Sequence, residues 1–404
     1  MLTNNSNQFI DITDTVIKPN YKSPLTRFTK ITRQMVKMLF NRIAYANEIW
    51  ELNKHSIDYT ENSSIRIDTS MYPPEIKELI ETESHEYSQL TFNIGERRVI
   101  IYIGNEYKSS IDDIIKRMYM WLIIASFYAD KPCSQTLTIY LSMTNSKKHL
   151  PNNSTDYIDR QHVNTAYTFP CKKNNEIHIF RKEEWFKVLI HETFHSFGLD
   201  FAAFDHKSTD KQILEIFNVV ADVRIFESYC EMWAEFINNM FIIFFNTKWN
   251  TSIDKWADIC IRKLEVLVYR EQMFSMLQCA KLLSHFQLHY TDLLTNMTNS
   301  TTPNPKYRDK THVLSYYIIK SILLYNINDF IEQCIDINGF SINFNKNVVN
   351  ENMKVYCEMV KKLHNNPRYI AELSRMISLL STPKYENLPN LYKESLYMSL
   401  HELG

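Results

Sequence analysis

The sequence predicts an α+β fold in which a small mixed β-sheet with helices comes first and a mostly helical half follows. Runs of β-branched residues are concentrated between positions 88 and 180. After Asp200 the strand signal nearly vanishes and helical periodicity dominates. The chain has 404 residues, of which 45% are hydrophobic, and is therefore long enough to bury a core in two or three subdomains.

The first 87 residues are predicted to form an arm followed by a helical segment. Residues 1–27 are polar and interrupted by prolines, which predicts a loose arm. Residues 30–53 have the spacing of an amphipathic helix with a basic face, and we expect that face to be solvated. Residues 54–74 are expected to form a loop that ends at Pro73 and Pro74.

Residues 88–200 are predicted to hold the sheet and the helix with the most distinctive motif. Two apolar runs flank Gly95 and Glu96, which is a hairpin signal. The expected order is a hairpin (89–94 and 97–103), a buried helix (110–129), three strands (137–143, 162–169 and 176–180) and a second helix (182–197). Gly198 suits the left-handed end of that second helix.

From residue 201 to residue 404 we expect a helical subdomain. Helical periodicity covers residues 211–244, 251–290, 313–332, 352–365 and 370–380. The segment 298–305 is rich in Thr, Asn and Pro, which predicts a surface loop. The predicted boundaries are therefore 1–87, 88–200 and 201–404.

Composition and charge argue against several classes of function. The chain has 45 basic and 46 acidic side chains, and this net charge of −1 argues against nucleic-acid binding through bulk electrostatics. It has only five glycines and no GxGxxG or GxxxxGK[ST] motif, so no phosphate-cradling loop is expected. Its apolar content is far too high for a disordered chain.

Cysteine usage and hydropathy indicate a reducing compartment. The seven cysteines are scattered and include no CxxC pair. The N-terminus lacks the basic and apolar regions of a signal peptide. The most apolar stretches, residues 118–129 and 241–245, are shorter than the roughly 18 residues that span a bilayer. We therefore expect a cytoplasmic protein without a membrane span, while the sequence leaves its oligomeric state open.

Residues 191–195 read His-Glu-Thr-Phe-His, which is an HExxH motif. His191 and His195 are four positions apart on the predicted helix, so both imidazoles can reach one metal ion. Glu192 lies further around the helix and can reach water at the metal without ligating the ion itself. The apolar residues around the motif predict a buried helix whose polar edge lines a cleft: Phe186, Leu189, Ile190, Phe194 and Phe197.

A catalytic zinc site needs a third protein ligand. The metzincin spacing would place a histidine at position 201, but Phe201 stands there. Glutamates at positions 227, 231 and 235 instead follow at intervals of four, and they share one face of the helix predicted there. Such a row is often only a solvated face, yet three acids without interleaved bases repel one another unless a cation is near.

The HExxH motif followed by Glu231-x-x-Ala234-Glu235 resembles the gluzincin family of zinc metallopeptidases, which have the zincin fold. The order of elements in residues 88–198 is similar to the N-terminal zincin subdomain, and the helical half is similar to its lower subdomain. In detail the chain also resembles predicted metallopeptidases of large DNA viruses, over about residues 88–330. The similar stretches are Lys147-Lys148, VNTAYTF, EEWFKVLIHETFHSFGLDF, YCEMWAEF and SYY.

The resemblance implies one Zn²⁺ per chain and a peptide or protein as substrate. Glu231 would be the third zinc ligand beside the two histidines, and Glu235 would hydrogen-bond His191 and orient it. Glu227 stays open as the alternative ligand. Glu192 would be the general base that takes a proton from water and passes it to the leaving amine.

Two further parts of the site are expected. Gluzincin-like sites commonly stabilise the oxyanion with a side chain from the lower subdomain, and the candidates are Tyr316 and Tyr317 with His312 behind them. Of these, Tyr316 is the residue expected to be catalytic. The strand at residues 162–169 (HVNTAYTF) would be the edge to which an extended substrate adds. An ordinary hairpin strand explains this segment equally well.

Two other functions remain open. The chain could be a non-catalytic zincin-like virion or host-interaction protein that keeps the fold and the metal. It could also be a helical interaction protein with an accidental HExxH. Glu192 favours the active peptidase, because a purely metal-binding scaffold does not require it. Metal content separates the accidental motif from the other two.

Overall fold

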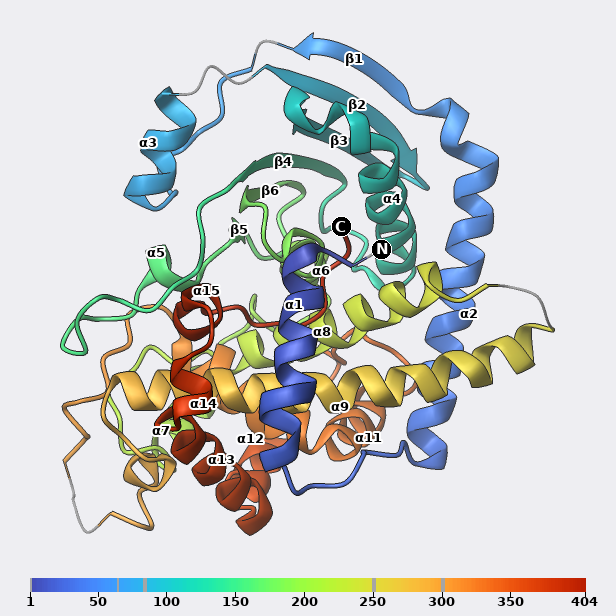
Figure 1. Cartoon of the computed structure of the whole chain (residues 1–404). Coiled ribbons are helices and arrows are strands. Elements are labelled where there is room, and N and C mark those ends of the chain that lie inside the picture. Colours follow the sequence, from blue (N-terminus) through green and yellow to red (C-terminus); the bar gives the residue numbers. More distant parts are fainter. Residues whose placement is uncertain (1, 64, 83–85, 249–251, 299–301) are drawn as a thin grey trace.

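The computed structural model describes residues 2–63, 65–82, 86–248, 252–298 and 302–404, and it contains one six-stranded mixed sheet (Figure 1). The strands lie in the order β1-β2-β3-β4-β6-β5. β3 pairs with β4, and β4 with β6, in parallel, whereas the other neighbours are antiparallel. Their bounds are β1 Asp58–Ser63, β2 Tyr87–Ile94, β3 Arg97–Gly104, β4 Thr136–Thr144, β5 Ala166–Thr168 and β6 Asn174–Arg181.

The register aligns apolar residues across the middle of the sheet. Ile101 of β3 is opposite Ile139 of β4, which in turn is opposite Ile177 of β6. All three are fully buried. Because alternate side chains of a strand point to one face, this row marks the face on which the helices pack.

Two helices cover that face and place the motif in the middle of the molecule. α4 (Ile111–Tyr128) and α6 (Trp185–Ser196) pack against each other, and α6 also packs on β5 and β6. On the opposite face, α3 (Pro74–Thr82) contacts β4. There Tyr72 packs with Ile76 and Phe180 in a small separate cluster.

The helical half is built around α8 (Ile225–Phe245) and α9 (Ile253–His285). α8 packs against α6 of the sheet half, and α9 packs against α8. The other helices are α1 Asn4–Ile12, α2 Lys30–Asn53, α5 Arg160–Val163, α7 Lys207–Leu214, α10 Lys320–Tyr325, α11 Ile327–Asn338, α12 Val349–Leu363, α13 Pro367–Leu380, α14 Pro383–Glu386 and α15 Asn390–Glu394. One hydrophobic core runs through both halves.

The predicted α+β arrangement is therefore confirmed, with the sheet in the first half and helices in the second. The hairpin, the helix at 110–129 and the strands at 137–143 and 176–180 correspond to β2, β3, α4, β4 and β6. The predicted left-handed end of the motif helix is also present, because Gly198 has φ +65°. A Cβ there would come within 2.9 Å of the sulfur of Cys133, so only glycine fits.

The first 27 residues are not a loose arm, which corrects the prediction. They contain α1 and a following irregular helical turn, and Phe9 and Ile17 are almost fully buried. Phe9 packs against Phe274 of α9 and Tyr392 of α15. The burial of this segment is supplied by residues more than 200 positions away, which no local pattern in a polar stretch indicates.

Three other local predictions need correction. The segment 54–74 contains strand β1, and the strand expected at residues 162–169 is shortened to β5, with the turn of helix α5 before it. The helix expected at 211–244 is interrupted between α7 and α8. Of the predicted loop at 298–305, residues 299–301 lie outside the described residues, as does position 251 of the helix expected at 251–290.

A disulfide joins Cys133 to Cys171, which the scattered cysteine pattern did not indicate. It lies beside the end of the motif helix, because the backbone N–H of Cys171 donates to the carbonyl of His195 at 3.0 Å. The remaining five cysteines are free and buried. The disulfide thus ties the start of β4 to the loop before β6, next to the site.

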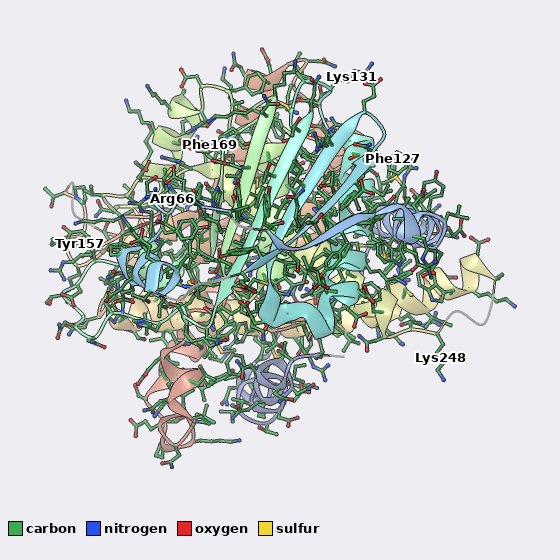
Figure 2. The ribbon with its side chains drawn as sticks, turned by 90° about the horizontal axis from the view of Figure 1, so that it is seen from above. Arg66, Phe127, Lys131, Tyr157, Phe169 and Lys248 are labelled. Carbon is green, nitrogen blue, oxygen red and sulfur yellow. A yellow bond between two sulfur atoms is a disulfide. The ribbon has the colours of Figure 1, made fainter. Side chains whose placement is uncertain are left out.

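Charged side chains project from the edges of the molecule. In the view from above the sheet, Lys131 and Lys248 project outward at the edge of the molecule (Figure 2). Both side chains are exposed. Among the described residues, no helix combines the length and the apolar character that crossing a membrane requires.

Candidate metal centre

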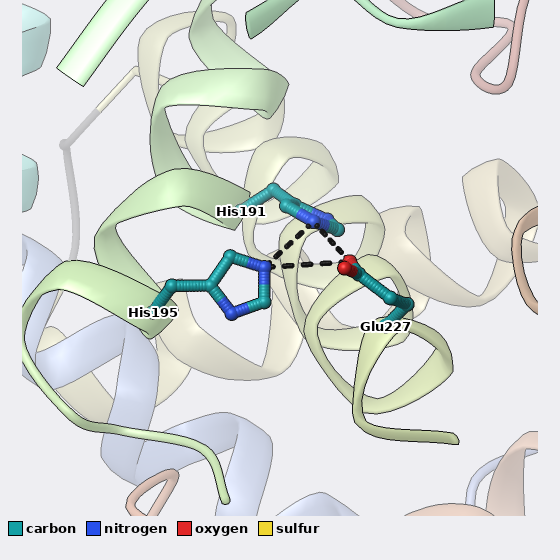
Figure 3. A group of neighbouring side chains, drawn as sticks. All are labelled: His191, His195 and Glu227. Atoms are coloured by element: carbon teal, nitrogen blue, oxygen red, sulfur yellow. Dashed lines mark hydrogen bonds and ion pairs between the residues drawn. The ribbon is translucent and has the colours of Figure 1, made fainter. Parts of the chain in front are cut away.

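α6 carries the HExxH motif as a buried helix, and α8 lies against the face that presents the two histidines. Every residue of α6 is buried, including His191, Glu192 and His195. Glu227 stands in the first turn of α8, and its side chain is directed at the histidine pair (Figure 3). The site therefore lies at the contact between α6 of the sheet half and α8 of the helical half.

Three side-chain atoms converge at this point. Nε2 of His191 lies 3.2 Å from Nε2 of His195 and 3.0 Å from Oε2 of Glu227. Nε2 of His195 lies 3.3 Å from the same oxygen. Zinc binds nitrogen and carboxylate oxygen at about 2.0–2.1 Å in tetrahedral sites, so its ligand atoms stand about 3.3 Å apart. The observed separations match this spacing.

The chemistry of the donor set also fits a cation. Nδ1 of His191 faces Oε2 of Glu231 at 3.1 Å, and Nδ1 of His195 faces Oδ2 of Asp200 at 2.5 Å. Carboxylates accept hydrogen bonds, so each Nδ1 donates, and each imidazole that loses its Nε2 proton to make way for a metal offers a lone pair there. Two such lone pairs and the Glu227 carboxylate then meet at one point, which a metal ion satisfies.

In the structure, the contacts expected of Glu231 and Glu235 are made by the glutamates one helical turn earlier. Glu227, the alternative, is the carboxylate beside both Nε2 atoms. Glu231, the expected third ligand, instead contacts Nδ1 of His191 and forms a buried ion pair with Lys187. Glu235, expected to orient His191, contacts Lys320 at 3.1 Å. The orienting role implied for Glu235 therefore fits Glu231.

Charges around the site are strongly coupled. Burial lowers the pKa of His191, but its bonds to Glu227 and Glu231 outweigh this effect and raise the pKa to about 9. Burial would raise the pKa of Glu227 and of Glu231, yet the neighbouring histidines, and Lys187 for Glu231, hold both values well below the usual range. Both groups are therefore carboxylates, as metal ligation and histidine orientation require.

Glu192 differs from these two acids. Its side chain is buried and lines a cavity of about 40 Å³ together with His191 and Tyr316. Burial raises the pKa of Glu192 and outweighs the lowering effect of His191 and His195, while Glu227 and Glu231 add to the rise. A buried carboxyl group beside the cavity is placed where a general base can accept a proton from water.

Tyr316 lies at the site, whereas Tyr317 and His312 are hydrogen-bonded to backbone carbonyl groups. The ring of Tyr316 is 6.1 Å from that of His191, and burial raises the pKa of its hydroxyl well above the usual value, so it stays a proton donor. Tyr317 donates to the carbonyl of Leu396 at 2.7 Å. Nδ1 of His312 is bonded to the carbonyl of Asp222 at 2.6 Å.

Asp200 and Cys230 are site residues that the sequence reasoning missed. Asp200 follows the turn at Gly198, which brings its carboxylate back to His195. The thiol of Cys230 donates to the same carboxylate at 3.2 Å. These two and His195 form a second group close enough to hold a metal. The members of that group already hydrogen-bond one another, because Nδ1 of His195 and the thiol of Cys230 both donate to Asp200, so the Nε2 group is the better site.

The segment expected to receive an extended substrate is partly present. β5 is an edge strand of the sheet, and Thr165 and Ala166 line the cavity beside Glu192. The carbonyl of Thr165 is used within the sheet, because it accepts from the N–H of Phe180. Only three residues form the strand, which limits how far a peptide can pair with it.

Searches with family models, among curated proteins and among solved structures each found no match to this chain.

Proposed function

We propose that this chain is a zinc-dependent metallopeptidase whose metal is held by His191, His195 and Glu227. The observation that carries the proposal is the convergence of three ligand atoms at separations of 3.0–3.3 Å, with Glu192 beside them. Three protein ligands with one position left open are typical of catalytic zinc, whereas structural zinc usually has four. When bound, zinc is a Lewis acid that acidifies water and polarises a carbonyl group.

The other residues of the site have separate roles in the proposed reaction. Glu192 accepts the proton of the attacking water and returns it to the leaving amine, for which its place beside the cavity suits it. The hydroxyl of Tyr316 donates a hydrogen bond to the oxyanion that develops on the substrate carbonyl. Glu231 and Asp200 hold the two imidazoles by their Nδ1 atoms, which keeps each Nε2 turned toward the metal.

The zincin fold and a gluzincin-like ligand pattern belong to the same proposal. A helix with HExxH beneath a mixed sheet, and a glutamate from a later helix, support it. The resemblance rests on Glu231-x-x-Ala234-Glu235, in which an acid four residues after the ligand orients the first histidine, and Cys230 stands where the earlier pair would need that alanine. Glu227 and Glu231 have this spacing and these contacts.

The size of the cavity favours a second candidate, a metal-binding protein without catalysis. About 40 Å³ beside Glu192 is only a few times the roughly 10–15 Å³ that one water needs. A peptide could enter only if neighbouring segments move. In this alternative the chain binds zinc and hydrolyses nothing.

The test combines metal content with hydrolysis. We expect elemental analysis of the purified chain to find one zinc per molecule, and a peptide library to be cleaved by the zinc-loaded protein. Glu192→Gln should keep the zinc and the fold and lose the hydrolysis, because the ligands are intact and the base is gone. Absence of zinc from wild type would overturn the proposal. Zinc without hydrolysis would select the second candidate.

A further inference from the structure

Residues 395–403, here called the C-terminal segment, run as an extended and buried stretch past the site. In Figure 1 the dark red end of the chain turns back from α15 toward α6. The segment is bridged to His149 at Ser395 and to Leu2 at Leu403. Leu396 and Leu400 are almost fully buried. The segment is thus part of the interior next to the motif helix.

The backbone of Met398 in this segment is fixed from both sides by buried charges. Its N–H donates to Oε1 of Glu184 at 3.0 Å, and its carbonyl accepts from Nζ of Lys320 at 2.5 Å. The N–H of Ser399 donates to the same Glu184 oxygen at 2.7 Å. Hydrogen bonds to charged groups are stronger than neutral ones, so Met398 is held in one position.

The same charges reach the metal site. Glu184 is close to Nζ of Lys148 and of Lys187, at 2.6 and 3.6 Å. Lys187 pairs with Glu231, whose carboxylate faces His191. The position of Met398 and the orientation of a candidate ligand are therefore set by one connected network.

Met398 forms part of the wall of the 40 Å³ cavity beside Glu192. Val163, Ala166 and Val188 are the other apolar residues of that wall. Lys148 and Lys187 also line it, but each ammonium already has a carboxylate partner within the protein. The cavity is small, and neither of these two lysines has an unpaired charge that would attract an acidic side chain.

We propose that Met398 is a specificity-determining residue, which restricts the substrate side chain next to the scissile bond to short, uncharged groups. This inference rests on the proposed function. Methionine has an unbranched side chain that fills irregular space, so its loss enlarges the cavity directly beside Glu192. The nature of the accepted substrate is thereby set by a segment more than 200 residues after the motif.

Binding of hydroxamates to the zinc-loaded full-length chain tests this without requiring turnover. Two zinc-binding hydroxamates are compared, one with an alanine-sized and one with a leucine-sized side chain beside the chelating group. By titration calorimetry we expect wild type to bind the small probe at least tenfold more tightly. Met398→Ala should bind the large probe about tenfold more tightly than wild type does, whereas Met398→Leu should keep the wild-type preference.

Leu400→Ala is the matched control, because Leu400 is buried in the same segment and lies outside the cavity wall. It should keep the preference for the small probe even if its thermal stability falls as much as that of Met398→Ala. An equal change of preference in both variants, or none in Met398→Ala, would overturn the role of Met398. Tighter binding of a probe with an acidic side chain by wild type would also overturn it.

The two proposals fail in different ways. If wild type binds zinc and the probes but cleaves no peptide, the peptidase proposal fails, and the probe preference still decides the role of Met398. If wild type cleaves peptides and shows no dependence on Met398, only the inference fails. A chain without zinc would overturn both.

Discussion

The carboxylate of Glu231 accepts a hydrogen bond from Nδ1 of His191 at 3.1 Å, on the edge of the ring opposite to the one that faces Glu227. One imidazole thus lies between two glutamates that are a single helical turn apart. Only the glutamate on the Nε2 side also reaches His195. This arrangement assigns different roles to two residues that sequence spacing makes equivalent.

The first prediction concerns these two glutamates. Glu227→Ala should remove a ligand and abolish stoichiometric zinc binding, whereas Glu231→Gln should weaken zinc binding about 10–100-fold, as loss of an orienting partner does. Chelator competition measures both affinities. Glu235→Gln is the control on the same helix face, and its zinc affinity should stay close to that of wild type. Stronger zinc loss for Glu231→Gln than for Glu227→Ala would restore the original ligand choice.

The second prediction concerns Tyr316. Tyr316→Phe should lower kcat about 100–1000-fold, the usual effect of removing one oxyanion donor, and should leave KM and zinc content nearly unchanged. Steady-state kinetics on a cleaved library peptide measures it. Tyr317→Phe is the neighbouring control, because it removes the bond to Leu396 and should cost about 1 kcal/mol of stability. Similar kinetics for both variants would exclude a catalytic role for Tyr316.

The third prediction concerns Lys281, whose ammonium is buried and donates to the carbonyl of Tyr392 at 2.9 Å. Burial lowers its pKa from 10.5 to about 7. Between these two values the unfolded chain binds more protons than the folded one, so raising the pH through this range stabilises the fold. The contribution is at most about 1.4 kcal/mol per pH unit.

Urea unfolding at pH 7 and pH 9 measures this dependence. Lys281→Met should show a smaller rise in stability between the two pH values than wild type, because the titrating group is gone. The comparison with wild type cancels the other titrating groups. Equal slopes for the two proteins would show that Lys281 is not the group responsible.

The fourth prediction concerns the disulfide between Cys133 and Cys171, which closes a loop of 38 residues. Loop-closure entropy for this length corresponds to about 4 kcal/mol, and native disulfides commonly contribute 2–5 kcal/mol. The double variant Cys133→Ser/Cys171→Ser should therefore unfold at clearly lower urea concentration. Wild type treated with reducing agent should shift by the same amount, whereas the double variant should not respond to it.

Much of the sheet half could be predicted because its signals are local. The hairpin of β2 and β3 turns at Gly95, and the end of α6 needs a left-handed residue, which Gly198 supplies. Both features depend on residues within a few positions. The HExxH motif is local too, since two histidines at a spacing of four share a helix face by geometry alone.

The choice among the glutamates could not be made in this way. Positions 227, 231 and 235 share one face of α8, so periodicity treats them alike. Which turn meets the histidines depends on how far α8 slides along α6, and this is set by packing between the two halves. The buried position of Phe9 has the same origin, because Phe274 and Tyr392 provide its surroundings.

The long-range contacts of the C-terminal segment affect the order of events during folding. Met398 meets Glu184 across 214 positions, and Leu403 is bridged to Leu2. Closing such long loops is costly in entropy and tends to occur late in folding. α6 and α8 can meet before that step, so during refolding we expect the metal ligands to assemble first, around a pocket that is still wide. Selectivity would then be the last property that the protein acquires.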